Sequence, residues 1–331
     1  MYFSEGKIDS NPSSFRPRVV ALIPCYNTRR YIREAVLGLL SQTRKLDLIV
    51  VLDDCSTDHF EETISDLVDQ NDNLVIHHNK KNLGRSGCRN EGFSCYPADY
   101  YILNDADDVS LPERVEKTLA FMQAHPRCGA CGGFVQYINS KSRVFGVGTQ
   151  MYSFTEADAQ RYRESLEPMG LFCSTVCIRG EVIHRDGLLF DTSLPASEDI
   201  ELWNLILEKG WDVMSMREFL SQYRLHDGSI CTSRFVYCKH HHMYVSDRLV
   251  RRRTGQTPIS FETFCRNIRA KGWWNWLKFE YPIYAEYFYR TGGFKLMEKH
   301  YIKGGFMMLL SLIMQPGRLK RLFRQRFGKR S

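Results

Sequence analysis

The sequence predicts an α/β fold with a mostly parallel central sheet flanked by helices. Between residues 19 and 110, short apolar segments alternate with helical patterns, as in βαβ units. With 331 residues, 43% of them hydrophobic, the chain can bury a full α/β core and a smaller second unit. Residues 239–331 carry 20 Lys and Arg against 5 Asp and Glu, a net charge of +15, while the remainder carries −8. This division predicts two functional zones.

The expected elements follow in chain order. The first strand starts at Val19 and runs into a polar turn, and further strands are expected at 48–52 and 100–103. Amphipathic patterns predict helices at 30–41, 60–70, 111–124 and 199–209. Between about 130 and 235 the pattern is otherwise less regular, with Gly-rich turns. No internal repeat or low-complexity segment is present.

Two acidic clusters each follow an apolar strand at its carboxyl end. They are Asp53-Asp54 and the three carboxylates Asp105, Asp107 and Asp108. Because unpaired buried carboxylates are costly, we expect a divalent cation to bridge them to an anionic ligand at this edge of the sheet. Oxygen ligands suit Mg²⁺ or Mn²⁺. The alternative is a solvated acidic turn that caps the helix beginning near Pro112, with Ser110 as N-cap.

Four motifs make the chain resemble the family 2 glycosyltransferases of GT-A fold, of the type that builds bacterial cell-surface glycans. They are Pro24-x-Tyr26-Asn27, Asp53-Asp54-x-Ser56-Thr57-Asp58, Asn82-x-Gly84 with Arg89-Asn90-x-Gly92, and Asp105-Ala106-Asp107-Asp108. Any one motif alone is weak, but the four in the family's order are highly specific, and the resemblance covers roughly residues 18–232.

This resemblance implies a domain organisation. A GT-A (Rossmann-like) domain is expected over 18–235, with a nucleotide-sugar half at about 18–125 and an acceptor half at about 126–235. An N-terminal tail, 1–17, precedes it, and a basic, aromatic-rich helical extension, 236–331, follows.

The resemblance also implies the reaction. An inverting transferase would move a sugar from a nucleotide-sugar donor, expected to be UDP-linked, to a hydroxyl of a glycan or lipid-linked acceptor. The pathway would be polysaccharide or lipopolysaccharide synthesis. Residues implied on the nucleotide side are Pro24, Tyr26, Asn27, Asp54, Arg85, Arg89 and Asp107. Tyr26 would stack on the base and Asp54 would bond to its edge. The resemblance implies that Asp105, Asp107 and Asp108 bind the metal, Mn²⁺ or Mg²⁺.

Ser197-Glu198-Asp199 opens an amphipathic helix, and local capping alone explains such a pattern. In the family the Asp of this helix is the general base, which implies that role for Asp199 and places Glu198 and Trp203 on the acceptor side. An inverting transfer needs one such carboxylate, because the base only has to take a proton from the attacking hydroxyl.

The segment Tyr223-Arg224-Leu225-His226 offers donors for a departing diphosphate. The family carries a similar pattern after the base helix, which implies that Arg224 and His226 lie on the diphosphate side. Ordinary polar residues on a surface strand are the alternative. Arg85 and Arg89 either touch phosphate or pair with the acidic clusters.

The chain departs from the family pattern at two cysteines. Cys55 stands where Gly is common and Cys88 where Ala is common, and both are small enough to fit. The eleven cysteines are scattered and odd in number, which favours a reducing compartment. Cys128-x-x-Cys131 lacks the paired spacing of a zinc ribbon, so no structural zinc is expected.

The carboxyl-terminal zone indicates where in the cell the protein acts. An apolar stretch, 306–314, precedes Pro316 and seven Lys and Arg residues without an acid. It is too short to span a bilayer, so we expect it either to lie on an anionic membrane surface or to pack against the catalytic domain. No signal peptide is visible. The expected location is cytoplasmic and peripheral, at the inner face of the membrane. No recognition motif accompanies the basic residues, so no nucleic acid is expected.

Two other functions are compatible with carboxylates on an α/β sheet. A sugar-phosphate nucleotidyltransferase would show a Gly-rich, basic loop after the first strand, where this chain has Pro24-Cys25-Tyr26-Asn27. A catalytically inactive glycan-binding GT-A domain is disfavoured because both the Asp cluster and Asp199 are present.

Overall fold

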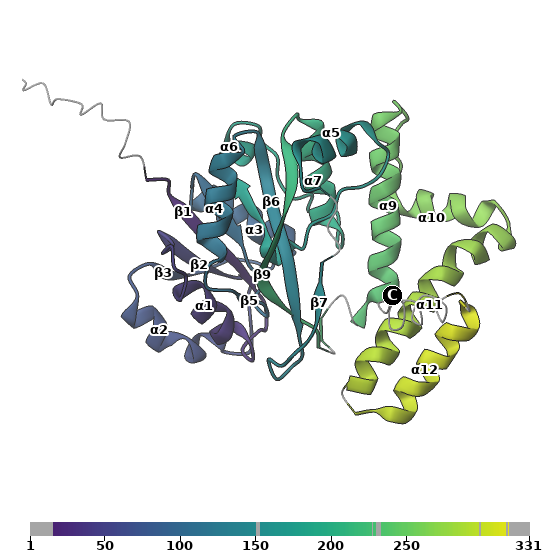
Figure 1. Cartoon of the computed structure of the whole chain (residues 1–331), viewed down its shortest axis with the longest axis horizontal. Helices are drawn as coiled ribbons and strands as arrows, with labels where there is room; N and C mark the ends of the chain where they lie inside the picture. Colours follow the sequence, from purple (N-terminus) through teal and green to yellow (C-terminus); the bar gives the residue numbers. More distant parts are fainter. Residues whose placement is uncertain are drawn as a thin grey trace, which may run out of the picture.

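A nine-stranded sheet occupies the centre of the first 225 residues of the computed structural model (Figure 1). The structure describes residues 16–149, 153–226, 228–229, 233–297, 299–315 and 317. The strand order of the sheet is β3-β2-β1-β4-β8-β6-β9-β5, and β7 pairs with β6. The predicted tail, 1–17, falls outside the described residues except for its last two positions.

Four parallel strands form the nucleotide half of the sheet. They are β1 (Val19–Cys25), β2 (Leu48–Asp53), β3 (Leu74–His78) and β4 (Tyr100–Leu103). β1 and β4 are buried between helices except at Pro24, which is why their sequences read as continuous apolar runs. Because β1 lies between β2 and β4, the direction of strand progression reverses beside β1, and α/β sheets bind ligands at the carboxyl edge of such a point.

Helices cover both faces of this half. They are α1 (Ile32–Leu40), η1 (Phe60–Thr63), α2 (Ser65–Gln70), α3 (Gly84–Cys95) and α4 (Arg114–Ala124). α3 approaches the sheet closely at Gly92, where a Cβ atom would come within 2.8 Å of the Leu52 side chain. The glycine of the Arg-Asn-x-Gly motif is therefore a packing requirement.

The second half of the sheet is mixed. It contains β5 (Val109–Ser110), β6 (Cys128–Ile138), β7 (Val144–Gly148), β8 (Cys177–Arg179) and β9 (Asp212–Arg224). β6 and β9 are parallel, whereas β8 runs antiparallel to both β4 and β6. The prediction of a mostly parallel sheet thus describes the nucleotide half, and the α/β fold itself is confirmed. The helical elements here are α5 (Glu156–Glu164), η2 (Cys173–Thr175), α6 (Gly180–His184) and α7 (Glu198–Glu208).

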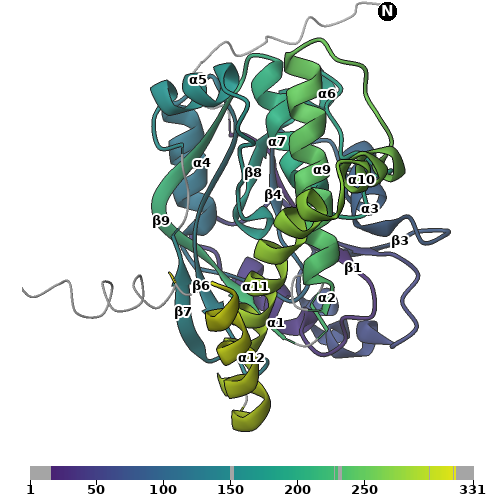
Figure 2. The same ribbon diagram turned by 90° about the vertical axis from the view of Figure 1, so that its right-hand side faces the viewer.

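The described part of the carboxyl-terminal extension contains four helices: α9 (Phe235–Arg253), α10 (Phe261–Ala270), α11 (Trp273–Met297) and α12 (Tyr301–Met314). Figure 2 shows α9 running along α7, while Figure 1 shows that α11 and α12 form a hairpin at the far end of the molecule from β3. Among the described residues, no helix combines the length and apolarity needed to cross a membrane. The seven terminal basic residues lie outside the described part of the chain.

Candidate active site

Two sequence motifs interlock at the carboxyl ends of β1 and β2. Asn27 adopts a left-handed φ of 54°, and its Oδ1 accepts a hydrogen bond from the Thr57 backbone N–H at 2.8 Å. Its own N–H donates to Ser56 Oγ at 3.0 Å. Pro24 lies within β1, opposite Leu52. The turn leaves the Tyr26 ring 53% exposed, and its stacking on a base stays a prediction.

The buried Asp54 carboxylate connects the second motif to the third. Its Oδ1 accepts hydrogen bonds from Leu83 N–H (2.8 Å) and Asn79 Nδ2 (2.9 Å), and its Oδ2 accepts from Gly84 N–H (2.8 Å). Gly84 has a φ of +70°, which glycine adopts without strain. Asp54 therefore holds the start of α3. Because Oδ2 has a single partner, one lone pair stays available for the predicted bond to the base.

Asp53 is engaged within the protein. It accepts hydrogen bonds from the Ser56 N–H (2.9 Å) and His78 Nδ1 (3.0 Å). Burial works against its charge, but these bonds lower the pKa of Asp53 below its ordinary value.

Arg89 is the central cation of the site. It is buried on α3, and its Nη2 donates to Asp105 Oδ1 at 2.6 Å, while Nη1 lies 3.5 Å from Glu198 Oε1. Arg85, one helical turn earlier, lies 3.3 Å from the same Glu198 oxygen. Burial opposes the charge of Arg89, yet its pKa is raised, with Asp105, Glu198 and Asp199 among the causes. Arg89 thus pairs with the second acidic cluster, whereas Arg85 pairs with Glu198 outside the clusters, and contact of either arginine with phosphate stays a prediction. Arg89 thereby joins the Asp105–Asp108 turn to α7.

Asp107 pairs with His226. The His226 Nε2 lies 3.0 Å from Asp107 Oδ2, and the Gly228 N–H donates to its Nδ1 at 3.2 Å. Since Nδ1 is an acceptor, the neutral ring carries its proton on Nε2 and donates it to Asp107. The side chains of both residues are partly exposed. Within the acidic turn, the Asp107 side chain is thus about as accessible as that of Asp105.

Asp108 is buried with one oxygen unsatisfied. Its Oδ1 accepts from the Arg224 backbone N–H at 2.7 Å, but its Oδ2 has no hydrogen-bond partner. Burial, reinforced by the charges of Asp107 and Asp105, raises the pKa of Asp108 well above its ordinary value. An orphaned carboxylate oxygen next to two further carboxylates is the environment that a divalent cation would relieve.

Arg224 holds the acidic turn in place. Its guanidinium donates to the Asp107 carbonyl (2.8 Å), Ser142 Oγ (2.9 Å) and Glu34 Oε2 (2.7 Å) and lies over the Tyr31 ring. The residue is only 1% exposed. The prediction that Arg224 faces the diphosphate is therefore corrected: in this geometry protein acceptors occupy its guanidinium, and it positions Asp107 and Asp108.

α7 brings Asp199 to the site. Its N-cap, Ser197, has a left-handed φ of 61° and makes no capping hydrogen bond through its side chain. Local capping by Ser197 thus does not explain the motif. Burial, followed by the charge of Glu198, raises the pKa of Asp199 to about 6. A carboxylate with a pKa near the operating pH is suited to general-base catalysis.

Trp203 lies inside the core. It has no exposed surface and packs beside Phe190. The prediction that it lies on the acceptor side is therefore wrong: one turn after Asp199, α7 has already passed from the site into the core. Glu198 is also buried, and it reaches Arg85 and Arg89 instead of open solvent.

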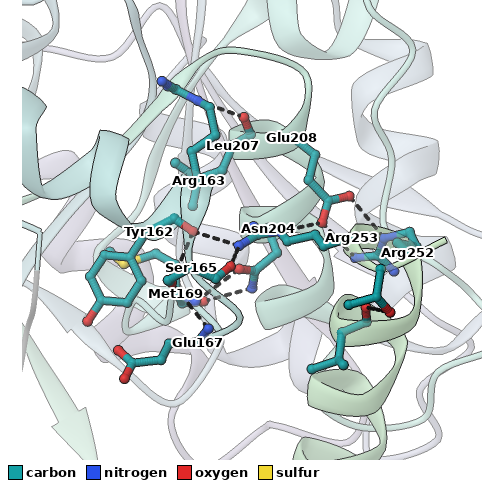
Figure 3. A network of polar contacts seen from close by, with 12 residues as sticks. Tyr162, Arg163, Ser165, Glu167, Met169, Asn204, Leu207, Glu208, Arg252 and Arg253 are labelled. Carbon is teal, nitrogen blue, oxygen red and sulfur yellow. Dashed lines mark hydrogen bonds and ion pairs between the residues drawn. The ribbon is translucent and has the colours of Figure 1, made fainter. Parts of the chain in front are cut away.

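The rest of α7 is fixed by polar contacts, shown in Figure 3. Asn204 bonds to both backbone groups of Met169, at 3.0 and 3.1 Å. Glu208 accepts from Arg252 Nε at 2.9 Å and from Arg253 Nε at 3.2 Å. On the same helix the buried Glu201 pairs with Arg252 at 2.6 Å. α9 thus contributes directly to holding the helix that carries Asp199.

Several supporting residues are not singled out by any motif. Buried Arg114 donates to Asn104 Oδ1 (3.0 Å), Ser110 Oγ (2.8 Å) and the Leu103 carbonyl (2.6 Å), fixing the end of β4. Burial lowers its pKa to about 10. The only local signal is the four-residue spacing between Ser110 and Arg114, and nothing in the sequence marks Glu34 as the partner of Arg224.

The comparison with protein families agrees with this geometry. The profile described as glycosyl transferase family 2 matches residues 20–178, which contain all four motifs. About half of the chain, residues 20–178, thus matches glycosyl transferase family 2. The family resemblance drawn from the motifs is thereby confirmed.

Curated relatives carry similar names. The chain is 25% identical over 228 residues to the "Putative teichuronic acid biosynthesis glycosyltransferase TuaG" of Bacillus subtilis, covering 69% of this chain and 86% of the relative. It is 27% identical over 219 residues to the "UDP-Glc:alpha-D-GlcNAc-diphosphoundecaprenol beta-1,3-glucosyltransferase WfaP" of Escherichia coli, covering 66% and 81%. The family 2 domain is thus that of a glycosyltransferase.

Solved structures show the same fold. S. aureus TarS 1–349 in complex with UDP-GlcNAc matches with a TM-score of 0.53 at 17% identity, over 89% of this chain and 79% of that chain. The mannosyltransferase PcManGT of Pyrobaculum calidifontis, in complex with GDP-Man and Mn²⁺, matches with a TM-score of 0.55 at 15% identity, over 72% and 65%. These likenesses establish the GT-A fold.

Proposed function

We propose that this family 2 glycosyltransferase performs an inverting transfer from a UDP-sugar to a hydroxyl of a lipid-linked glycan. The observation that carries the proposal is the position of Asp199. Its carboxyl group, with a pKa of about 6, sits on the helix that Arg89 ties to the Asp105–Asp108 turn. A base beside a cation-binding turn is the arrangement that an inverting transfer from a nucleoside diphosphate requires.

Asp107 and Asp108 are the residues that would hold Mn²⁺ or Mg²⁺. Asp107 is partly exposed, and the free Oδ2 of Asp108 fits a hard cation. Asp105 is already paired with Arg89, so its part is to align the turn. When bound, the metal supplies positive charge that stabilises the departing diphosphate. PcManGT, whose solved structure contains Mn²⁺, supports this choice.

The protein's own residues divide the remaining work. Asp199 accepts the proton of the attacking hydroxyl, and Glu198 with Arg85 and Arg89 fixes the start of its helix. His226, protonated on Nε2, could donate to a phosphate oxygen, while Asp107 would be one of the residues that hold the metal. Tyr26 and Asp54 are the proposed contacts of the base. Positioning and electrostatic stabilisation provide most of the rate enhancement in this mechanism.

The choice of substrates rests on relatives. The name of WfaP gives UDP-Glc as donor and a diphosphoundecaprenol-linked sugar as acceptor, and TarS has been solved with UDP-GlcNAc. The name of TuaG refers to teichuronic acid biosynthesis. By analogy, we assign this chain to cell-envelope polysaccharide synthesis at the inner face of the membrane. No Gly-rich phosphate loop follows β1, which disfavours a nucleotidyltransferase.

The test is a panel of UDP-, GDP- and dTDP-sugars incubated with purified protein and Mn²⁺ or Mg²⁺. A short-chain lipid-diphosphate-GlcNAc serves as acceptor, and product anomers are assigned by NMR. The proposal predicts metal-stimulated transfer from a UDP-sugar with inversion. Retention of anomeric configuration, or release of pyrophosphate from a nucleoside triphosphate, would refute it.

A further inference from the structure

One face of α12 exposes a stripe of large apolar side chains. Ile302, Phe306, Leu309 and Ile313 recur at intervals of four, three and four residues, so they lie on one side of the helix. Their exposed fractions are 92%, 61%, 55% and 63%. α12 contains no acidic residue. Monomeric soluble proteins rarely expose a contiguous apolar patch of this kind, so the stripe requires a partner.

The opposite face of α12 is packed too tightly for the stripe to turn inward. A Cβ atom on Gly292 would lie 2.9 Å from the Met308 backbone nitrogen, and one on Gly304 would lie 2.8 Å from that of Leu296. Ser311 Oγ donates to the Ala285 carbonyl of α11 at 2.8 Å. Small residues therefore bring the two helices into backbone contact, as membrane helix pairs do. This packing fixes which side of α12 faces outward.

Exposed aromatic residues elsewhere on α11 and the charge of this part of the chain also indicate lipid. Trp273 and Trp274, at the start of α11, are 60% and 62% exposed, and Tyr284 is 41% exposed. Residues 287–331 carry eleven Lys and Arg but one Glu. Exposed Trp and Tyr rings and clustered basic residues are the side chains that gather at the interface between water and anionic lipid.

We propose that the α11–α12 hairpin is a membrane-binding element that lays the α12 stripe into the headgroup region of an anionic bilayer. This inference rests on the proposed function, since it specifies how the enzyme meets the membrane that carries its acceptor. The 14 residues of α12 span about 21 Å, short of the roughly 30 Å hydrocarbon core, so the helix lies along the surface. A second copy of the chain is a poorer partner, because residues 287–331 carry a net charge of +10 in each copy and would repel each other.

The test uses full-length protein and flotation with vesicles of phosphatidylcholine, with or without about 30% phosphatidylglycerol. The variant Ile302→Ser/Phe306→Ser/Ile313→Ser removes most of the stripe. The matched control, Leu37→Ser/Leu166→Ser, removes exposed apolar side chains from the catalytic domain. Melting temperature and donor-sugar hydrolysis are measured for each protein, so that loss of folding or of activity is separated from loss of binding.

We expect wild type and control to float with anionic vesicles, increasingly weakly as salt is added. The stripe variant should bind at least about tenfold more weakly with unchanged melting temperature and hydrolysis. The inference is overturned if the stripe variant floats as well as the wild type. It is also overturned if the wild-type protein does not bind anionic vesicles. The inference is also overturned if the wild-type protein forms a dimer without lipid and the stripe variant is a monomer, because the stripe would then serve self-association. If hydrolysis persists in these cases, the proposed transferase function stands.

Discussion

Replacing Asp199 by Asn should lower the turnover of the enzyme and at the same time raise the stability of its fold above about pH 6. The ordinary pKa of an Asp side chain is about 3.9, whereas in the folded protein the pKa of Asp199 is about 6. The folded state therefore favours the protonated form. The associated stability is fully present below pH about 4 and is lost as the pH rises through about 6. Two units of pKa correspond to about 3 kcal/mol, which is the upper limit of what ionised Asp199 costs the fold above that pH.

The neutral amide of Asn avoids this cost but cannot accept the proton. We expect Asp199→Asn to lower turnover by roughly 10²–10⁴ while nucleotide affinity stays within a few-fold. At pH 8 the variant should melt at a higher temperature than wild type, by a few degrees, and the difference should vanish near pH 4. The wild-type rate should fall as the pH drops below about 6, because Asp199 then becomes protonated.

Asp191 provides a matched control. Burial opposes its ionisation, but Ser193 and Arg248 lower its pKa below the ordinary value. Asp191→Asn should therefore destabilise the protein at pH 8 and leave the pH profile of the rate unchanged. Steady-state kinetics and thermal melts from pH 4 to pH 9 measure both effects. Near-wild-type turnover of Asp199→Asn, or a lower melting temperature at pH 8, would refute the assignment of Asp199 as a general base with a raised pKa.

Three further substitutions test other parts of the site. Asp108→Asn should abolish transfer together with the Mn²⁺-dependent part of nucleotide affinity, measured by calorimetry with and without metal; an unchanged rate in chelator would contradict the metal assignment. Cys55→Gly should preserve or raise stability by up to about 1 kcal/mol in urea unfolding, because Cys55 has a φ of 67°; clear destabilisation would contradict this. Arg252→Ala should cost roughly 2 kcal/mol, because Glu201 keeps only Arg248 as partner; an unchanged urea midpoint would show that the pairing is not stabilising.

Sequence patterns were sufficient to predict those elements whose structure depends on neighbouring residues in the chain. β1, β2 and β4 are apolar runs that end in polar turns, so their positions and the meeting of the motifs could be predicted. The exchange of hydrogen bonds between Asp54 and the Asn82–Gly84 segment fits the same expectation. β8 could not be predicted, because three residues carry no periodicity and its pairing with β4 depends on distant parts of the chain.

Side-chain direction was the main source of error. Tyr223 and Arg224 are adjacent on β9 and so point to opposite faces of the sheet, and the motif does not reveal which face is buried. Arg224 reaches Glu34, 190 residues earlier. In the same way, Trp203 follows Asp199 at helical spacing, but only the first turn of α7 lies at the site. Residue type was therefore predictable at these positions, and burial was not.

The contacts of α7 connect the chemistry to the proposed membrane surface. Its first turn carries Asp199, and its next turns are held by Arg248, Arg252 and Arg253 of α9. α9 continues through α10 into the α11–α12 hairpin by short connections. Because this link is made of packed helices and of ion pairs to α7, two of them to the buried Glu201, the height of Asp199 above a bound bilayer would be set by the fold and not by a flexible linker. An acceptor whose lipid tail is fixed in that bilayer would then meet the base at a defined depth, which raises its effective concentration relative to the same glycan free in solution.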